Sequence, residues 1–148
     1  MATIKAYNKI LNHQENLKNQ ALLAYQQAIN DFERSAEKLH LLLNKKEQVE
    51  KEYNYYLSSS GTVTTLATHY AFIEQIKERI YTVQVEVNQK RAVMEKKQQK
   101  LTEEHIEVKK FEKIIEKKQL RILEKEKYLE SQMMDEISTR QYFNHGNR

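Results

Sequence analysis

The stretch "YLSSSGTVTTLATHY", residues 56–70, is where this chain can reverse its direction. Its turn-forming residues are Ser58, Ser59, Ser60 and Gly61. Gly61 can take the left-handed conformation that ends a helix. Either Thr64 or Thr65 can then cap the helix that follows. The sequence therefore predicts a turn within residues 58–65.

The composition favours helix on both sides of this turn. The 148 residues include no proline and only two glycines, which are the residue types that interrupt helices. The second glycine, Gly146, lies in the polar tail "FNHGNR", where we expect fraying. We predict an all-α chain with helices at about residues 3–57 and 65–142, forming a single coiled-coil domain over residues 1–148.

Apolar residues recur at every seventh position of the second helix. They are Leu66, Ile73, Ile80, Val87, Met94, Leu101, Val108, Ile115, Ile122 and Leu129. These residues form a seam, which is a line of apolar side chains along one face of the helix. A seam of ten such positions is typical of a coiled coil. The first helix repeats apolar residues at spacings of three and four, at Leu22, Tyr25, Ile29, Phe32, Ala36, Leu39 and Leu43. We therefore expect two long helices that pack along narrow seams.

A hairpin folded at Gly61 brings the two seams together. Facing residues should then have numbers that sum to about 122. The apolar pairs are Val49 with Ile73, Leu42 with Ile80, Ala28 with Met94, Ala21 with Leu101 and Tyr7 with Ile115. Two polar residues interrupt the match, Ser35 opposite Val87 and Gln14 opposite Val108. The pattern predicts an antiparallel coiled-coil hairpin; a rod that opens and pairs with a second copy is the alternative.

The second helix also carries a row of positive charge. Lysine or arginine stands at every fourth position, at Lys109, Lys113, Lys117, Arg121 and Lys125. We call this row the basic ridge. The first thirty residues contain one acidic side chain, Glu15, that could pair with it. Beyond residue 118 the second helix has no facing helix, yet it remains apolar at Ile122, Leu123, Leu129, Met133, Met134 and Ile137. This pattern indicates a docking surface. A solvated helix face and self-association in a dimer are the alternatives.

The sequence offers little for catalysis. It has no cysteine, so it can form neither a disulfide framework nor a thiolate metal site. Its five histidines make no pair at helical spacing, and no glycine-rich phosphate loop is present. We expect neither enzymatic activity nor a cofactor. No apolar run is long enough for a transmembrane segment, so we expect a cytoplasmic protein.

Aromatic residues gather near the turn, at Tyr53, Tyr55, Tyr56, Tyr70 and Phe72. Most clusters of this kind pack a turn. Tyr53 and Tyr56 lie along one stripe, whereas Tyr55 must point elsewhere and Phe72 stands next to the seam residue Ile73. We therefore expect some of these rings to be exposed and to mark a partner contact.

Three stretches resemble the flagellar FliJ family of the type III export apparatus. They are "THYAFIEQI" after the turn, "LTEEHIEVKKFEK" in the second helix and "MMDEISTR" near its end. The resemblance implies an antiparallel coiled coil similar to the central stalk of rotary ATPases. It further implies a non-enzymatic factor of flagellar protein export. Its partners would be a hexameric export ATPase, the cytoplasmic domain of the export gate membrane protein, and export chaperones.

The resemblance also implies where these partners bind. Tyr70, Phe72 and Ile76 match the region that contacts the export gate, and we expect Tyr53 of the aromatic cluster to join them. The expected contacts to the ATPase are the basic ridge together with Ile122, Leu129 and Met133. Asp135, Glu136 and Arg140 match the C-terminal motif. The implied location is cytoplasmic, on the inner face of the membrane at the flagellar base, and no nucleic acid is expected. A nucleic-acid-binding adaptor that uses the basic ridge, or a homo-oligomeric scaffold, remains the alternative.

Overall fold

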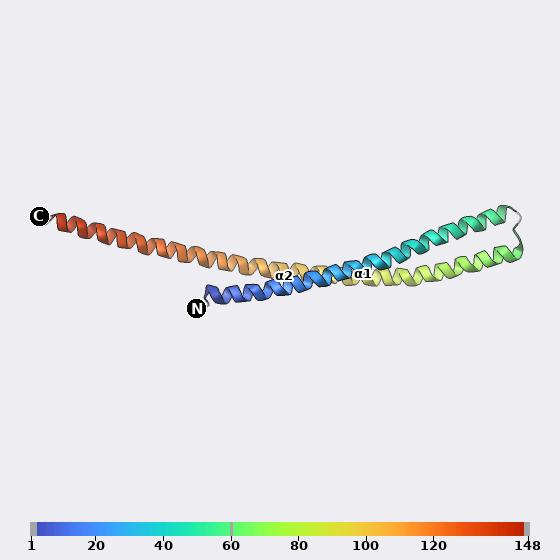
Figure 1. The fold of residues 1–148 in the computed structure, drawn as a ribbon, viewed down its shortest axis with the longest axis horizontal. Helices are drawn as coiled ribbons and strands as arrows, with labels where there is room; N and C mark the ends of the chain where they lie inside the picture. Colours follow the sequence, from blue (N-terminus) through green and yellow to red (C-terminus); the bar gives the residue numbers. More distant parts are fainter. Residues whose placement is uncertain (1–2, 60, 147–148) are drawn as a thin grey trace. The chain divides into compact units, whose positions relative to one another are not determined.

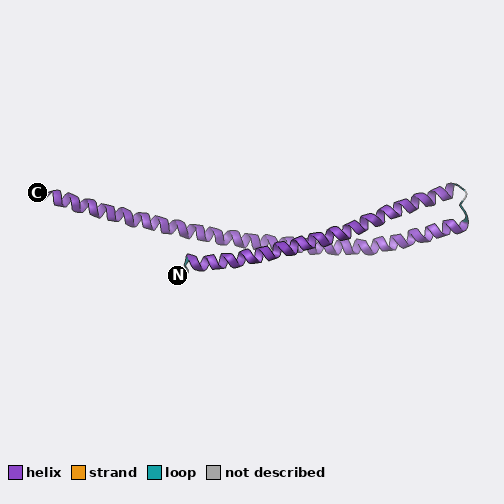
Figure 2. Ribbon diagram, viewed as in Figure 1, coloured by secondary structure: helices purple, strands orange, loops and turns teal. Residues whose placement is uncertain are grey.

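The computed structural model describes residues 3–59 and 61–146, which form two long helices (Figures 1 and 2). Helix α1 spans Ile4–Ser58 and α2 spans Val63–Gly146. The described residues include no strand, so the predicted all-α fold of two long helices is confirmed. Helix α2 continues to Gly146, and the fraying predicted for the tail is therefore wrong up to that residue. The chain divides into two compact units, residues 19–102 and residues 1–18 with 103–148.

The turn follows the end of α1. The Gly61 N–H donates to the carbonyl oxygen of Tyr56 at 3.1 Å, and the hydroxyl groups of Ser58 and Ser59 donate to the carbonyl oxygen of Tyr55. These bonds satisfy carbonyl groups that a helix end otherwise leaves open. Ser60 lies outside the described residues.

Glycine is needed at position 61 because the backbone approaches closely. A Cβ atom there would lie 2.6 Å from the Tyr56 carbonyl oxygen, which is nearer than real Cβ atoms come. No glycine with a positive φ is recorded among the described residues. The structure thus supports a role for Gly61 in the turn through this approach, and not through the left-handed conformation predicted from the sequence.

Helix α2 begins with a threonine cap. The hydroxyl oxygen of Thr62 accepts a hydrogen bond from the Thr65 N–H at 3.2 Å, which is the bond expected between an N-cap side chain and the third helical residue. The predicted caps, Thr64 and Thr65, are therefore wrong. Both residues already lie inside the first turn of the helix, which begins at Val63.

In the unit of residues 19–102, α1 and α2 run antiparallel on either side of the turn (Figure 1). Val49, Ile73 and Ile76 form its buried cluster, and Tyr53 and Ile80 pack against it. The other buried seam residues are Ala21, Ala28, Ser35, Val83 and Val87. Burial every seventh residue on both helices agrees with the predicted seams.

Contacts between the two helices of this unit keep the register predicted from the sequence. Lys38 forms an ion pair with Glu86 at 3.6 Å, and the Arg91 guanidinium lies 5.5 Å from the centre of the Phe32 ring. The residue numbers of both pairs sum to nearly 122. The similar sums indicate that the two helices stay in phase from the turn as far as Phe32 of α1 and Arg91 of α2.

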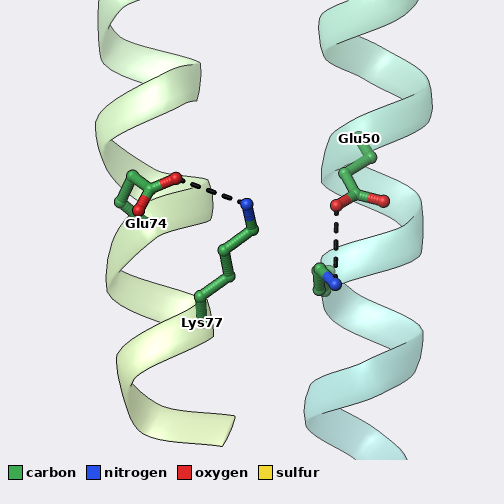
Figure 3. A network of polar contacts seen from close by, with 4 residues as sticks. Glu50, Glu74 and Lys77 are labelled. Carbon is green, nitrogen blue, oxygen red and sulfur yellow. Dashed lines mark hydrogen bonds and ion pairs between the residues drawn. The ribbon is translucent and has the colours of Figure 1, made fainter. Parts of the chain in front are cut away.

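Ion pairs within each helix add to the surface of this unit. Glu74 pairs with Lys77 on α2 at 3.4 Å, and Glu50 pairs with Lys46 on α1 at 3.7 Å. Figure 3 shows Glu74 and Lys77 on one helix and Glu50 on the other. Exposed pairs of this kind contribute at most about 1 kcal/mol each. The apolar seam, and not these pairs, holds the two helices together.

The unit of residues 1–18 and 103–148 packs the start of α1 against α2. Val108 and Ile115 of α2 are buried, and the Lys118 ammonium lies 5.0 Å from the centre of the Tyr7 ring. The described α1 residues of this unit are all at least partly exposed. Gln14 has an inaccessible Oε1 atom that accepts no hydrogen bond within the described structure. The α1 segment of this unit is therefore held by fewer buried side chains than α1 in the other unit.

Candidate protein-docking surfaces

The last part of α2 is exposed along its length. Every residue from 119 to 146 is exposed. The exposed set includes large apolar side chains, namely Leu120, Ile122, Leu123, Leu129, Met133, Met134 and Ile137. Ile122 and Leu129 continue the heptad seam that is buried at Val108 and Ile115. A seam exposed in this way is a candidate surface for a protein partner.

The basic ridge is mostly unpaired. Lys109 forms an ion pair with Glu112 on its own helix at 3.3 Å. Within the part of the chain that the structure describes, the other four residues of the ridge make no ion pair. Their charge is therefore available to an acidic partner, subject to screening by salt.

Part of the ridge meets the first residues of α1 at an open hollow. Its lining is Thr3, Ile4, Lys5, Lys118, Arg121, Ile122 and Lys125. Two isoleucines supply the apolar surface, and four cations stand around it. Of the predicted contacts the structure brings together Arg121, Ile122 and Lys125, whereas Lys109, Lys113 and Lys117 lie outside the hollow.

Sequence reasoning missed Lys5 and Lys118 as part of this surface. The pairing rule that aligned the seams also places the first residues of α1 near residue 118, and that signal could have found them. Lys118 differs from its neighbour Lys117 because its ammonium stacks on the Tyr7 ring. Such a contact is favourable for a cation over an aromatic face.

The residues predicted to contact the export gate fall into two groups. Phe72 is 42% exposed and Tyr70 is more exposed still, so both rings are open to a partner. Ile76 is only 6% exposed and lies in the cluster with Val49, against which Tyr53 packs. Phe72 and Tyr70 are therefore the accessible members of the set.

Phe72 helps to line a groove between the helices. The groove is lined by Lys38, Leu41, Leu42, Lys45, Phe72, Ile76, Arg79 and Val83. Leu41 of α1 is largely exposed there and was not selected from the sequence. Its position next to the seam residue Leu42 is the signal in the sequence that could have identified it.

The aromatic cluster near the turn is partly packed. The Tyr56 ring lies 5.1 Å from the His69 ring and 5.6 Å from the Tyr55 ring, between ring centres. His69 also bridges the helices, because its Nε2 atom lies 3.8 Å from Glu52 of α1. Tyr55 remains largely exposed. The expected exposure of some of these rings is confirmed, whereas Tyr56 packs against His69.

The described residues contain neither a metal-binding group nor a membrane span. Residues 3–59 and 61–146 contain no group of three histidine, cysteine or acidic side chains that could hold a metal ion. No helical stretch in the same ranges is long and apolar enough to cross a membrane. The exposed surfaces of α2 and the groove at Phe72 are therefore the candidates that the structure offers.

Comparison with known proteins identifies the family of this chain. The sequence model of the family described as flagellar FliJ protein matches residues 4–147. The flagellar FliJ protein of Bacillus subtilis (strain 168) is 38% identical over 140 residues, which cover 95% of each of the two chains. The chain belongs to the flagellar FliJ family. FliJ membership makes it a flagellar export-related protein that takes part in flagellum biogenesis. No solved structure matches it.

Proposed function

We propose that this FliJ-family protein is a non-enzymatic stalk or adaptor that couples a hexameric export ATPase to the cytoplasmic domain of the membrane export gate. It would also meet export chaperones during flagellum assembly. It would work in the cytoplasm, peripherally at the membrane of the flagellar base, and without nucleic acid. One observation carries the proposal: α2 presents seam residues and unpaired cations together on the part of the helix where every residue from 119 to 146 is exposed.

The ATPase contact would combine two kinds of side chain. Ile122, Leu129 and Met133 are exposed apolar residues that gain about 25 cal/mol for each Å² removed from water. The ridge cations are exposed, so a partner with acidic residues would be attracted to them over a distance. Complementary charge of this kind raises the association rate more than it raises the final affinity.

The test uses the charge reversal Lys117→Glu/Arg121→Glu. Both residues are exposed, so helicity and melting temperature should stay nearly unchanged. The association rate with the cognate export ATPase should fall several-fold at low salt, and the difference should shrink as salt screens the charges. Lys96→Glu/Lys97→Glu, a reversal at exposed sites of the other unit, should have no effect on this rate. An unchanged rate at low salt would show that the ridge is only a solvated face.

The seam supplies the second arm of this test. Ile122→Ser and Leu129→Ser remove exposed apolar surface and no charge. Each should weaken ATPase binding by a similar factor at low and at high salt. If the seam variants bind as the unchanged protein does, the apolar part of the contact lies elsewhere.

The gate contact would use the accessible rings near the turn. Phe72→Ala should weaken binding to the cytoplasmic domain of the gate while the melting temperature changes little, because Phe72 is 42% exposed. Ile76→Ala is the matched control, since truncation of a buried isoleucine costs about 2–5 kcal/mol of stability. A binding titration and a circular dichroism melt separate the two effects. If Phe72→Ala lowers stability as much as Ile76→Ala and leaves binding intact, Phe72 belongs to the core.

A further inference from the structure

The exposed end of α2 divides into a basic half and an acidic half. Residues 118–127 carry four basic and two acidic side chains, whereas residues 128–137 carry three acidic and no basic ones. No charged side chain from Arg121 to Arg140 has an ion pair within residues 3–59 and 61–146. Unpaired charges of opposite sign therefore lie next to each other along one helix.

An apolar stripe runs through both halves on one helical face. At 100° per residue, this face holds Lys118, Ile122, Lys125, Leu129, Met133 and Glu136, with Gln132 beside them. All but Lys118 are exposed, and Lys118 is partly exposed. The face thus begins with two cations, Lys118 and Lys125, ends with the anion Glu136, and carries apolar side chains at Ile122, Leu129 and Met133.

This arrangement is complementary to itself in the antiparallel direction. When a twofold axis passes between residues 127 and 128, Ile122 of one copy lies opposite Met133 of the other. Lys118 then falls close to Glu136, and Arg121 falls close to Asp135 at the flank. A parallel pair in register would instead place each of these charges opposite its own kind, which is unfavourable.

The hollow at the start of α1 fits the same arrangement. Its apolar lining consists of Ile4 and Ile122, and Lys5, Lys118, Arg121 and Lys125 stand around it. In the antiparallel pair, Met133 of the second copy lies at this hollow. Methionine is flexible and fills irregular apolar gaps. Asp135 and Glu136 of the second copy then reach the cations at the rim.

We propose that two copies of this chain pair antiparallel through residues 118–137 of α2, with Met133 of each copy in the hollow beside Ile122 of the other. The contact is isologous, because each copy gives the same residues to it. It does not depend on the proposed ATPase contact. It uses the same face, however, so a chain paired in this way has no free end of α2 for another partner.

Sedimentation equilibrium of the purified chain at low salt, over a series of concentrations, tests the proposal. The unchanged chain should form dimers as its concentration rises. Arg121→Glu and Asp135→Arg should each raise the dimer dissociation constant about tenfold or more, since each places like charges opposite one another. The double variant Arg121→Glu/Asp135→Arg should restore dimers, because every copy then supplies the exchanged pair. Lys96→Glu, at an exposed position in the other unit, should leave the constant unchanged.

Three results would overturn the proposal. The unchanged chain could stay monomeric at every concentration, the single reversals could leave dimers intact, or the double variant could associate no better than the single ones. Circular dichroism of each variant checks that the helices persist, which is expected because both positions are exposed. Since no ATPase is present, the outcome is independent of the proposed function.

Discussion

At the scale of the residue, two polar side chains in the seam of α1 differ in whether their polar atoms are hydrogen-bonded. Ser35 is 2% exposed, and its hydroxyl donates to the Phe32 carbonyl oxygen at 2.9 Å. Gln14, three heptads earlier, has an inaccessible Oε1 atom without a hydrogen bond in the described structure. The sequence identified both as mismatches in the pairing. Only Gln14 carries the cost of an unsatisfied buried polar atom, which is about 1–3 kcal/mol.

Replacing Gln14 with leucine should stabilise the protein. The change removes the unsatisfied oxygen and places an apolar side chain at the seam position that faces Val108. We expect the free energy of unfolding to rise by about 1 kcal/mol, measured by urea denaturation followed by circular dichroism. Gln27→Leu, at an exposed position of the same helix, should change it by less than about 0.5 kcal/mol. A loss of stability in Gln14→Leu would mean that the amide has a partner, such as an ordered water.

At the scale of the element, the turn depends on how α1 ends and α2 begins. The Gly61 N–H bonds to the Tyr56 carbonyl oxygen, and Thr62 caps the next helix. Gly61 therefore helps to end α1, and its neighbour Thr62 caps the start of α2. Few residues are left between the two helices, and a change at Gly61 acts directly on the reversal of the chain.

The two glycines give a matched comparison. Gly61→Ala places a Cβ atom 2.6 Å from a backbone oxygen, so the backbone must shift. We expect a cost of about 1–3 kcal/mol, as for other overpacked sites. Gly146→Ala meets nothing within 4 Å and should leave stability unchanged or slightly higher, because alanine favours helix. Thermal melts of both variants test this. Equal melting temperatures would show that the turn relaxes at little cost.

At the scale of the whole molecule, both helices carry one seam each, and the turn pairs the seams within the chain. Val49 and Ile73 lie in one buried cluster although the turn separates them in sequence. The same residues could pair between two copies if the hairpin opened. The proposed antiparallel contact through α2 uses other residues, so the two kinds of association can be distinguished.

A disulfide test decides between a closed hairpin and an opened one. The sequence has no cysteine, so Val49→Cys/Ile73→Cys introduces the only two thiols. Oxidation at low protein concentration should give an internal disulfide, seen as a monomer of altered mobility on a non-reducing gel. Ala21→Cys/Ile73→Cys is the control and should give no internal bond. Disulfide-linked dimers of the first variant, without the monomeric product, would contradict the hairpin.

Local preference and periodicity determined most of this fold. The near absence of glycine and proline predicted two long helices, and the serine-glycine stretch predicted the turn to within a few residues. The seven-residue repeat of apolar side chains predicted which residues form the seam. The constant sum of the numbers of facing residues predicted the register in which the helices pair. These features follow from the sequence because helix propensity and heptad spacing act over short distances along the chain. The family resemblance also rested on the sequence alone.

Only the tertiary structure decided what each side chain does at the surface. Phe72 is exposed while Ile76, one turn later, is buried against Val49. Lys118 stacks on Tyr7, whereas the adjacent Lys117 makes no such contact with any ring in the described residues. The hollow between Ile4 and Ile122 exists because α1 begins beside α2 at that level. The physical reason is common to all three: burial and pairing depend on the side chains of the facing helix, which lie far away in the sequence.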